Sequence, residues 1–278
     1  MNFTAILRTP GEAATAKTEG LERLPFAAGI FRTTKDRATL ESPVIAAPTT
    51  FDDLVGSWNA VLPQGAGLTM QAQVRTGRLW SAWYELGQAE GLKGARLELR
   101  SPSRQEDEDG FVAVDTLKLK SPASAFRYRL RLHATARPAV LRLAAVTVSD
   151  AQAPAGPARF RGGPWVRELA VRGRSQFAES DDYKHDICSP TSLAAVLEYW
   201  GMRKNTLDIA ERVRDLTTGD FGDWPFNVAA AAALGLSRTQ IVWSVILPQS
   251  ASGLVTGLLL GLARAAGETA PIMFTATI

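Results

Sequence analysis

Residues 186–192 have the sequence DICSPTS, and they contain the only cysteine of this 278-residue chain, Cys188. A helix is predicted to begin here, because apolar residues recur at helical spacing from Leu193 to Trp200 before Gly201. The positive end of the helix dipole favours the reactive thiolate of a cysteine at such a position. A buried structural cysteine is the alternative. The polar residues around Cys188 favour the reactive thiol.

A glutamine stands upstream of this cysteine. Gln176 lies in the run Arg174-Ser175-Gln176, and its side-chain amide can donate to the oxyanion of a tetrahedral intermediate. Acyl transfer to a thiol also needs a base that faces it. His185 is a possible substitute base, although a hydrogen bond within its own loop is the alternative. His133, the other histidine, is predicted to lie on the surface of a strand and is a weaker candidate.

Several blocks in this part of the chain follow one another in a recognisable order: Arg174–Gln176, Cys188–Leu193, Leu197–Gly201 and Trp224–Asn227. Over residues 165–235 they resemble family thirty-nine of the papain-like cysteine peptidases, a fold also found in bacteriocin-processing transporters. The resemblance is to free-standing bacterial members with an N-terminal β-rich region. It implies that Cys188 is the nucleophile, that Gln176 is the oxyanion donor, and that a peptide or protein substrate is cleaved through a thioester on Cys188. It implies no cofactor and no metal.

The sequence departs from this family after about residue 236. The resemblance implies a catalytic histidine and aspartate on later strands, but no histidine or aspartate follows Arg238. The tail, residues 237–278, is therefore a divergent native end, the product of a truncated or frame-shifted gene, or part of a pseudoenzyme that keeps the shape for binding. The expected peptidase activity is weak or absent.

Alternation of apolar and polar residues dominates the first half of the chain. Apolar residues alternate with arginines in Phe126–Leu132, and Leu68–Val74 has the same period, with Gly- and Pro-containing turns between such runs. This pattern favours strands with one buried face. We expect an α+β fold: an antiparallel β-sandwich over residues 1–150, a Pro- and Gly-rich linker over 151–164, and an incomplete papain-like domain over 165–278.

Aromatic residues in Trp80–Tyr84 suggest a second function. Strict alternation would place Trp80 and Tyr84 on one face and Trp83 on the other, where it could stack on a sugar. Filling of the core or its edge is the alternative. A non-catalytic binding protein for a glycan or peptide is thus a rival, as is a transglutaminase-like acyl transfer through the same thiol. The acidic run Glu106–Asp109 is predicted to be a solvated turn, with calcium binding as the alternative.

Composition narrows the classes of partner. The net charge is only +3 with interspersed signs, which argues against nucleic-acid binding. A single cysteine excludes an internal disulfide and a multi-cysteine metal site. The longest apolar stretch, residues 254–263, is short of the roughly 20 residues that span a membrane. No leader segment is recognised. Localisation stays open, because members of the resembling family are often exported.

Overall fold

A computed structural model of the chain describes residues 3–7, 9, 11–25, 29–94, 96–102, 105–150, 170–179 and 182–233. Of the described residues, 48% are in strands and 15% in helices, and all pairs of these strands are antiparallel, which confirms the predicted α+β class with a β-rich N-terminal half. The predicted linker and the tail 237–278 lie outside the described residues.

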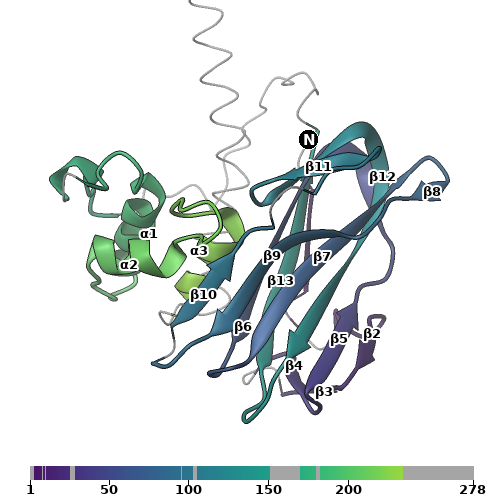
Figure 1. The fold of residues 1–278 in the computed structure, drawn as a ribbon, viewed down its shortest axis with the longest axis horizontal. Coiled ribbons are helices and arrows are strands. Elements are labelled where there is room, and N and C mark those ends of the chain that lie inside the picture. Colours follow the sequence, from purple (N-terminus) through teal and green to yellow (C-terminus); the bar gives the residue numbers. More distant parts are fainter. Residues whose placement is uncertain are drawn as a thin grey trace, which may run out of the picture.

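Thirteen strands and four helices make up the described fold (Figure 1). The strands are β1 (Phe3–Leu7), β2 (Lys17–Glu19), β3 (Leu21–Arg23), β4 (Phe31–Thr33), β5 (Arg37–Glu41), β6 (Ile45–Val61), β7 (Gly67–Thr76), β8 (Leu79–Trp80), β9 (Tyr84–Gly91), β10 (Leu97–Arg100), β11 (Gly110–Ala113), β12 (Thr116–His133) and β13 (Val140–Ser149). The helices are the 3₁₀ turn η1 (Gln176–Ala178), α1 (Cys188–Tyr199), α2 (Thr206–Val213) and α3 (Trp224–Ala233).

Two long strands connect the two layers of the sheet. The second half of β12 pairs with β7 on one side and β5 on the other, and β9 and β10 follow β7. The second half of β6 pairs with β13, which β1 flanks in turn. A Cβ at Gly56 of β6 would lie 2.8 Å from side-chain atoms of Met70 and Leu86, so β6 faces β7 and β9 across the core. This face-to-face packing is the arrangement expected of a sandwich.

The alternation predicted for β12 is present. Phe126, Tyr128, Leu130 and Leu132 are buried, and the arginines between them point outward. Phe126 meets Phe51 of β6 edge-on, with ring centroids 5.9 Å apart. Burial of these large side chains is the main favourable term that holds the two layers together.

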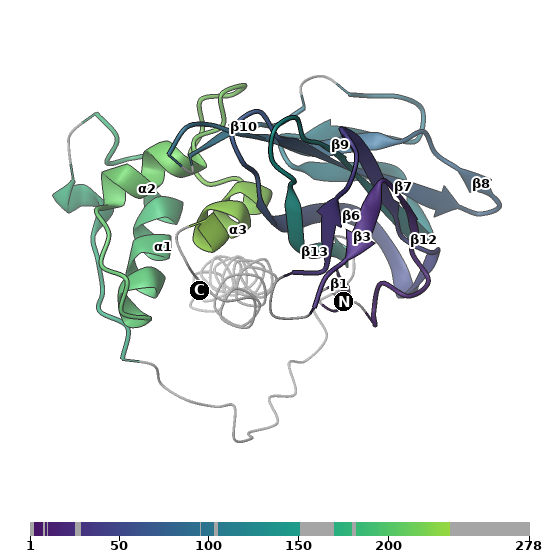
Figure 2. The same cartoon turned by 90° about the horizontal axis from the view of Figure 1, so that it is seen from below.

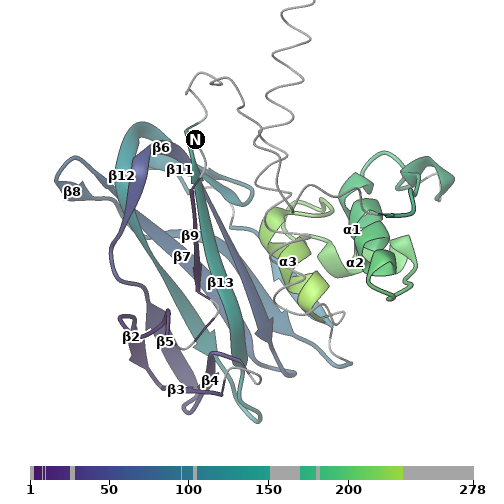
Figure 3. The ribbon, with the colours of Figure 1, turned by 180° about the vertical axis from the view of Figure 1, so that it is seen from behind.

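The three α-helices pack at one side of the sheet (Figure 3). Helix α3 lies between the strands and the pair α1 and α2 (Figure 2). Its Phe226 contacts Trp58 of β6, with centroids 6.3 Å apart, and both side chains are fully buried. Leu143 and Ala145 of β13 share a second apolar cluster with residues of all three helices. The helical and β-rich halves therefore have common cores.

The structure corrects the strict alternation expected for Trp80–Tyr84. The chain leaves β8 at Trp80 and enters β9 only at Tyr84, so the residues between them are not part of a strand. The Arg127 guanidinium lies 5.0 Å from the ring centroid of Trp80 and 5.2 Å from that of Trp83, so these two rings lie on the same side. Tyr84 is buried and donates its hydroxyl hydrogen to Asp107. Each tryptophan has a second arginine over its ring, Arg75 for Trp80 and Arg129 for Trp83.

The acidic run forms the turn that was expected. Asp107 Oδ1 accepts hydrogen bonds from the backbone N–H groups of Asp109 and Gly110, at 2.9 and 3.1 Å. Burial, followed by the hydrogen bond to Asp107, raises the pKa of the Tyr84 hydroxyl well above its usual range. Within the described ranges, no group of three or more His, Cys, Asp or Glu side chains is arranged to hold a metal ion.

Candidate active site

Cys188 is the first residue of α1, and its side chain is exposed. The helix buries the opposite side, including Leu193 and Leu197, against the rest of the molecule. The N-cap is Ile187, which offers no side-chain acceptor. No side chain caps the helix, and the Thr191 hydroxyl donates to the Ile187 carbonyl at 2.7 Å. The thiol is thus presented to solvent at the N-terminus of a helix anchored by its apolar face.

A buried asparagine holds the residue after the cysteine. Asn227 Nδ2 donates to Ser189 Oγ at 2.8 Å and to the Gly222 carbonyl at 2.6 Å. Gly222 has φ +98°, and a Cβ there would lie 2.5 Å from Ser189 Oγ. Only glycine combines that backbone conformation with so close an approach. The start of α1 is therefore fixed from the side by α3.

This contact ties the candidate nucleophile to the β-rich half. Phe226 of α3 is buried against Trp58 of β6, and the next residue, Asn227, reaches Ser189 of α1. Consecutive residues of one helix thus anchor it in the sandwich core and position the cysteine helix. The sequence resemblance includes Trp224–Asn227 but does not indicate the role of Asn227, because its partner is 38 residues away.

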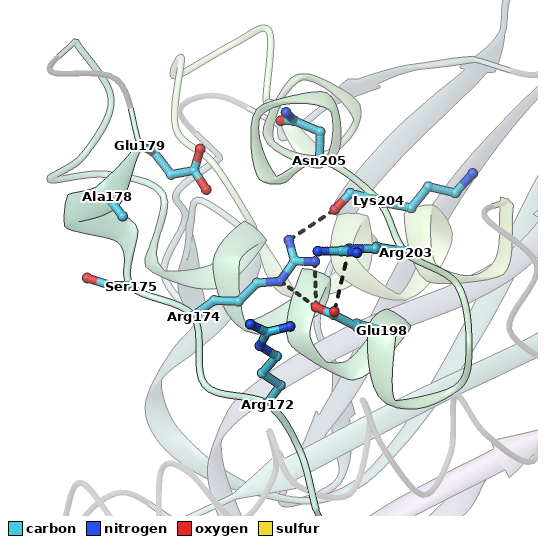
Figure 4. Close-up of a pocket in the computed structure, with 9 residues that line it drawn as sticks. All are labelled: Arg172, Arg174, Ser175, Ala178, Glu179, Glu198, Arg203, Lys204 and Asn205. Carbon is cyan, nitrogen blue, oxygen red and sulfur yellow. Dashed lines mark hydrogen bonds and ion pairs between the residues drawn. The ribbon is translucent and has the colours of Figure 1, made fainter.

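Gln176 begins the 3₁₀ turn η1. Two residues earlier, Arg174 anchors this segment to α1: Nε and Nη2 donate to Glu198 Oε2 at 3.0 and 2.7 Å, and Nη1 donates to the Lys204 carbonyl at 3.0 Å (Figure 4). Within the described part of the chain, the Gln176 side chain forms no hydrogen bond.

Ring contacts bring the glutamine turn next to the cysteine loop. Phe177, directly after Gln176, meets His185 edge-on with ring centroids 5.8 Å apart. Tyr183 of the same loop packs on Phe221, at 5.5 Å. The elements that carry Gln176 and Cys188 are therefore neighbours, as the predicted roles of these two residues require.

His185 is exposed, and its ring contacts Phe177 edge-on. Among the described residues, no hydrogen bond joins His185 to Cys188 or to Asp186. His133 lies at the far end of β12, where its ring packs against Gly67 in the β-rich half. The structure therefore does not bring a histidine into contact with the candidate nucleophile.

Two carboxyl groups meet where the loop after α2 joins the edge of β10. Asp215 is fully buried and accepts backbone hydrogen bonds from Ser101 and Thr217, at 3.1 and 2.7 Å. Burial opposes ionisation, but these hydrogen bonds outweigh it and lower the pKa of Asp215. Burial, repulsion from Asp115 and the contact with Asp215 raise the pKa of Asp223 to about 8. Asp223 directly follows Gly222, so this pair sits beside the contact that holds Ser189.

Two family models match the chain: Peptidase C39 N-terminal domain over residues 11–148 and Peptidase_C39 like family over residues 168–250. The chain belongs to peptidase family C39. The first match takes in most of the sandwich of the C39 chain, and the second takes in its helices together with Gln176 and Cys188. The resemblance inferred from the sequence blocks is confirmed, including its β-rich N-terminal region.

The last part of the C39 chain is also similar to membrane transport proteins. A third family model, Binding-protein-dependent transport system inner membrane component, matches residues 228–278. The chain is 50% identical over 44 residues to the probable phosphate transport system permease protein PstA of Methanocaldococcus jannaschii, which is 16% of each chain. It is 51% identical over 47 residues to PstA of Haemophilus influenzae, 17% of each chain.

The C39 chain therefore spans about a sixth of the length of these curated relatives. The peptidase and transport matches overlap over residues 228–250. The loss of peptidase resemblance predicted near residue 236 falls inside this overlap. A truncated or frame-shifted gene stays a prediction. None of the described helices is long and apolar enough to cross a membrane.

Two solved structures align with about half of the C39 chain at low TM-scores. One is that of infectious bursal disease virus Gx strain, with a TM-score of 0.27 and 8% identity over 54% of this chain and 32% of that one. Another is TmCBM61 in complex with β-1,4-galactotriose, with a TM-score of 0.26 and 10% identity over 50% of this chain and 88% of that one.

Proposed function

We propose that the C39 chain is a cysteine peptidase-like protein that forms a thioester on Cys188 with peptide-type acyl donors. The observation that carries this proposal is the exposed thiol at the start of α1, beside the turn that begins with Gln176. In this reaction the thiolate attacks the carbonyl carbon, the carbonyl oxygen becomes an oxyanion, and the bond to the leaving group breaks. Water then hydrolyses the thioester and releases the free thiol.

Gln176 and the backbone N–H of Cys188 are the proposed oxyanion donors. A donor aimed at the oxyanion acts only in the transition state, because the charge develops there. Arg174 supports this role by fixing the segment before Gln176 to Glu198. Asn227 supports the other side of the site by holding Ser189.

Protonation of an amine leaving group is the step for which the sequence contains the fewest candidate residues. The 278 residues contain two histidines, His133 and His185, and no aspartate follows Asp223. His185 is the proposed substitute base, and a rotation away from Phe177 is needed before it can act. We therefore expect acylation by activated esters, whose leaving groups need no proton, and slow or absent cleavage of ordinary peptide amides.

A comparison of two acyl donors tests this proposal. A peptide p-nitrophenyl ester is expected to release about one equivalent of nitrophenol and to leave an acyl adduct on Cys188, whereas the matching amide gives little turnover. The Cys188→Ala variant serves as the blank. The same chain unfolded in urea supplies the rate of an unassisted thiol. If the folded and unfolded chains were acylated at the same rate, the proposed acyl-transfer site would be contradicted.

The glycan-binding alternative for the N-terminal half stays a prediction. Each of Trp80 and Trp83 has two arginine guanidinium groups within 6 Å of its ring centroid, so a sugar that stacks on these rings must displace an arginine. No observation favours this alternative over the thiol chemistry.

A further inference from the structure

A cavity of about 480 Å³ lies beside the turn that carries Gln176, on the side bounded by the end of α1 (Figure 4). Three separate segments line it: residues 172–179, Glu198 of α1, and the loop between α1 and α2. Its size is within the range of small-molecule sites, roughly 300–1,000 Å³. No step of the thiol chemistry uses this cavity.

Three guanidinium groups converge on one carboxylate in this cavity. Arg174 binds Glu198 Oε2 at 2.7 Å, and Arg203 Nε lies 3.7 Å from Glu198 Oε1. Arg172 has no hydrogen bond or ion pair among the described residues, although it acts on Glu198 through space. The hydrogen bond from Arg174, together with these neighbouring charges, lowers the pKa of Glu198. The three guanidinium groups outnumber the two carboxylates of the lining, those of Glu198 and Glu179, so the cavity keeps a net positive charge.

The exposed fractions of the side chains distinguish the residues of this cluster that are held in an ion pair from those that can bind a ligand. The Arg174 and Glu198 side chains are only 19% and 20% exposed, as expected of a pair that braces the fold. Arg203 is 80% exposed, and Arg172 is exposed as well. These two arginines can pair with an incoming anion without breaking the Arg174–Glu198 bridge.

The opposite wall is less positive. Glu179 points into the cavity there, with the Asn205 amide nearby (Figure 4). A carboxylate on that wall repels a purely anionic ligand but accepts a hydrogen bond from a hydroxyl group. The preferred ligand therefore carries its charges at one end and a donor at the other.

We propose that this cavity, here called the arginine pocket (Arg172, Arg174, Glu179, Glu198, Arg203 and Asn205), binds a small organic acid with two or more carboxylates and a hydroxyl group. Arg172 and Arg203 form charge-assisted hydrogen bonds with the carboxylates, and Glu179 accepts from the hydroxyl. Such a ligand joins residues 172–179 to the loop after α1. This site goes beyond the proposed acylation of Cys188 and does not depend on it.

Calorimetric titration of the whole chain with citrate tests the proposal, with sodium chloride at matched ionic strength as the reference. We expect saturable binding with one site, and about tenfold or greater weakening in Arg172→Gln/Arg203→Gln, because each loses a charged donor. Both side chains are exposed, so circular dichroism is expected to be unchanged. The control, Lys35→Gln/Arg137→Gln, removes the same charge from exposed turns of the β-rich half and is expected to bind like the wild type.

Two comparison ligands define the chemistry. Tricarballylate, which lacks the hydroxyl, is expected to bind more weakly than citrate, and Glu179→Gln is expected to reduce that difference. Pyrophosphate binding that exceeds citrate binding would replace the organic acid with a phosphate ligand and overturn the proposal as stated. Absence of saturable binding, or equal weakening in the control variant, would show that no such site exists. Because the readout is heat of binding, failure here is distinct from failure of Cys188 acylation.

Discussion

Asn227 Nδ2 lies 2.8 Å from Ser189 Oγ, and Ser189 directly follows the candidate nucleophile, Cys188. Asn227 itself is 2% exposed, and it also donates to the Gly222 carbonyl. One side chain of α3 thus fixes both the start of α1 and the loop that approaches it. Because Phe226 anchors α3 in the sandwich, the β-rich half of this C39 chain is part of the support of the cysteine site.

Loss of this amide should affect both stability and chemistry. Asn227→Ala leaves two partner groups without their donor, so we expect the free energy of unfolding to fall by about 1–3 kcal/mol. Acylation of Cys188 should slow as well, since the helix start becomes less fixed. Urea denaturation and ester acylation measure the two effects. Ser192→Ala removes only a hydroxyl that donates to the Cys188 carbonyl on an exposed face, and it should change neither. Equal effects in the two variants would contradict the role of Asn227.

A pair of glycine variants isolates the close approach at Ser189. Gly222→Ala places a Cβ 2.5 Å from Ser189 Oγ at φ +98°, whereas Gly219→Ala meets nothing within 4 Å at φ +85°. Both incur backbone strain of about 1–3 kcal/mol, but only the first also displaces Ser189. We expect Gly222→Ala to be less stable than Gly219→Ala and to acylate more slowly. Identical denaturation midpoints would show that the contact with Ser189 carries no strain.

Coupling of the two halves predicts one cooperative transition. Phe226→Ala removes a fully buried ring that contacts Trp58, so the expected loss is about 3–5 kcal/mol. Phe177→Ala, at a position 65% exposed, should change stability by less than about 0.5 kcal/mol. Tryptophan fluorescence and helical circular dichroism should report the same midpoint in the wild type. A helical transition that separates from the fluorescence transition would argue for independent halves.

Asp223 predicts how stability depends on pH. Its folded pKa is about 8 because of burial and the Asp115 and Asp215 carboxyls, with Asp220 also nearby. An unfolded aspartate titrates near pH 4, so between about pH 4 and 8 the folded chain keeps a proton that the unfolded chain has lost. Stability should therefore fall as pH rises through this window, by at most about 1.4 kcal/mol per pH unit, and by less where solvent screens the group.

The variant Asp223→Asn does not titrate, and its stability should vary less with pH than that of the wild type. Urea midpoints at about pH 5, 6.5 and 8 measure this difference. Asp36→Asn changes an exposed carboxylate of the β-rich half that does not act on Asp223, and it serves as the control. Parallel pH profiles for the wild type and Asp223→Asn would contradict the raised pKa.

Local patterns in the sequence predicted the elements well. The start of α1 at Cys188, its end before Gly201 and the alternation of β12 follow from periodicity and glycine placement, and all three are present. Periodicity does not decide which of two adjacent polar residues is the N-cap of a helix. Asn205 and Thr206 can both cap a helix, and in the structure Asn205 is the N-cap of α2 and accepts from the Leu207 N–H at 2.8 Å. Only the backbone conformation of each residue decides between them.

Contacts between distant segments could not be predicted from periodicity. The Asn227–Ser189 hydrogen bond and the Asp215–Ser101 hydrogen bond join residues 38 and 114 positions apart. Trp80 and Trp83 lie on one side against Arg127 of β12, which is far from them in sequence. The resemblance predicts Cys188 and Gln176 as site residues, and the structure shows which contacts hold the elements that carry them.

The most direct test of the account compares two reactions of the same thiol in Gln176→Ala. Acylation by a peptide p-nitrophenyl ester passes through an oxyanion, whereas alkylation by iodoacetamide does not. We predict that Gln176→Ala lowers the acylation rate of Cys188 by about 100-fold and leaves the alkylation rate within about twofold of the wild type. Equal changes in both rates, or no change in either, would contradict the assignment of Gln176 and Cys188 to one acyl-transfer site.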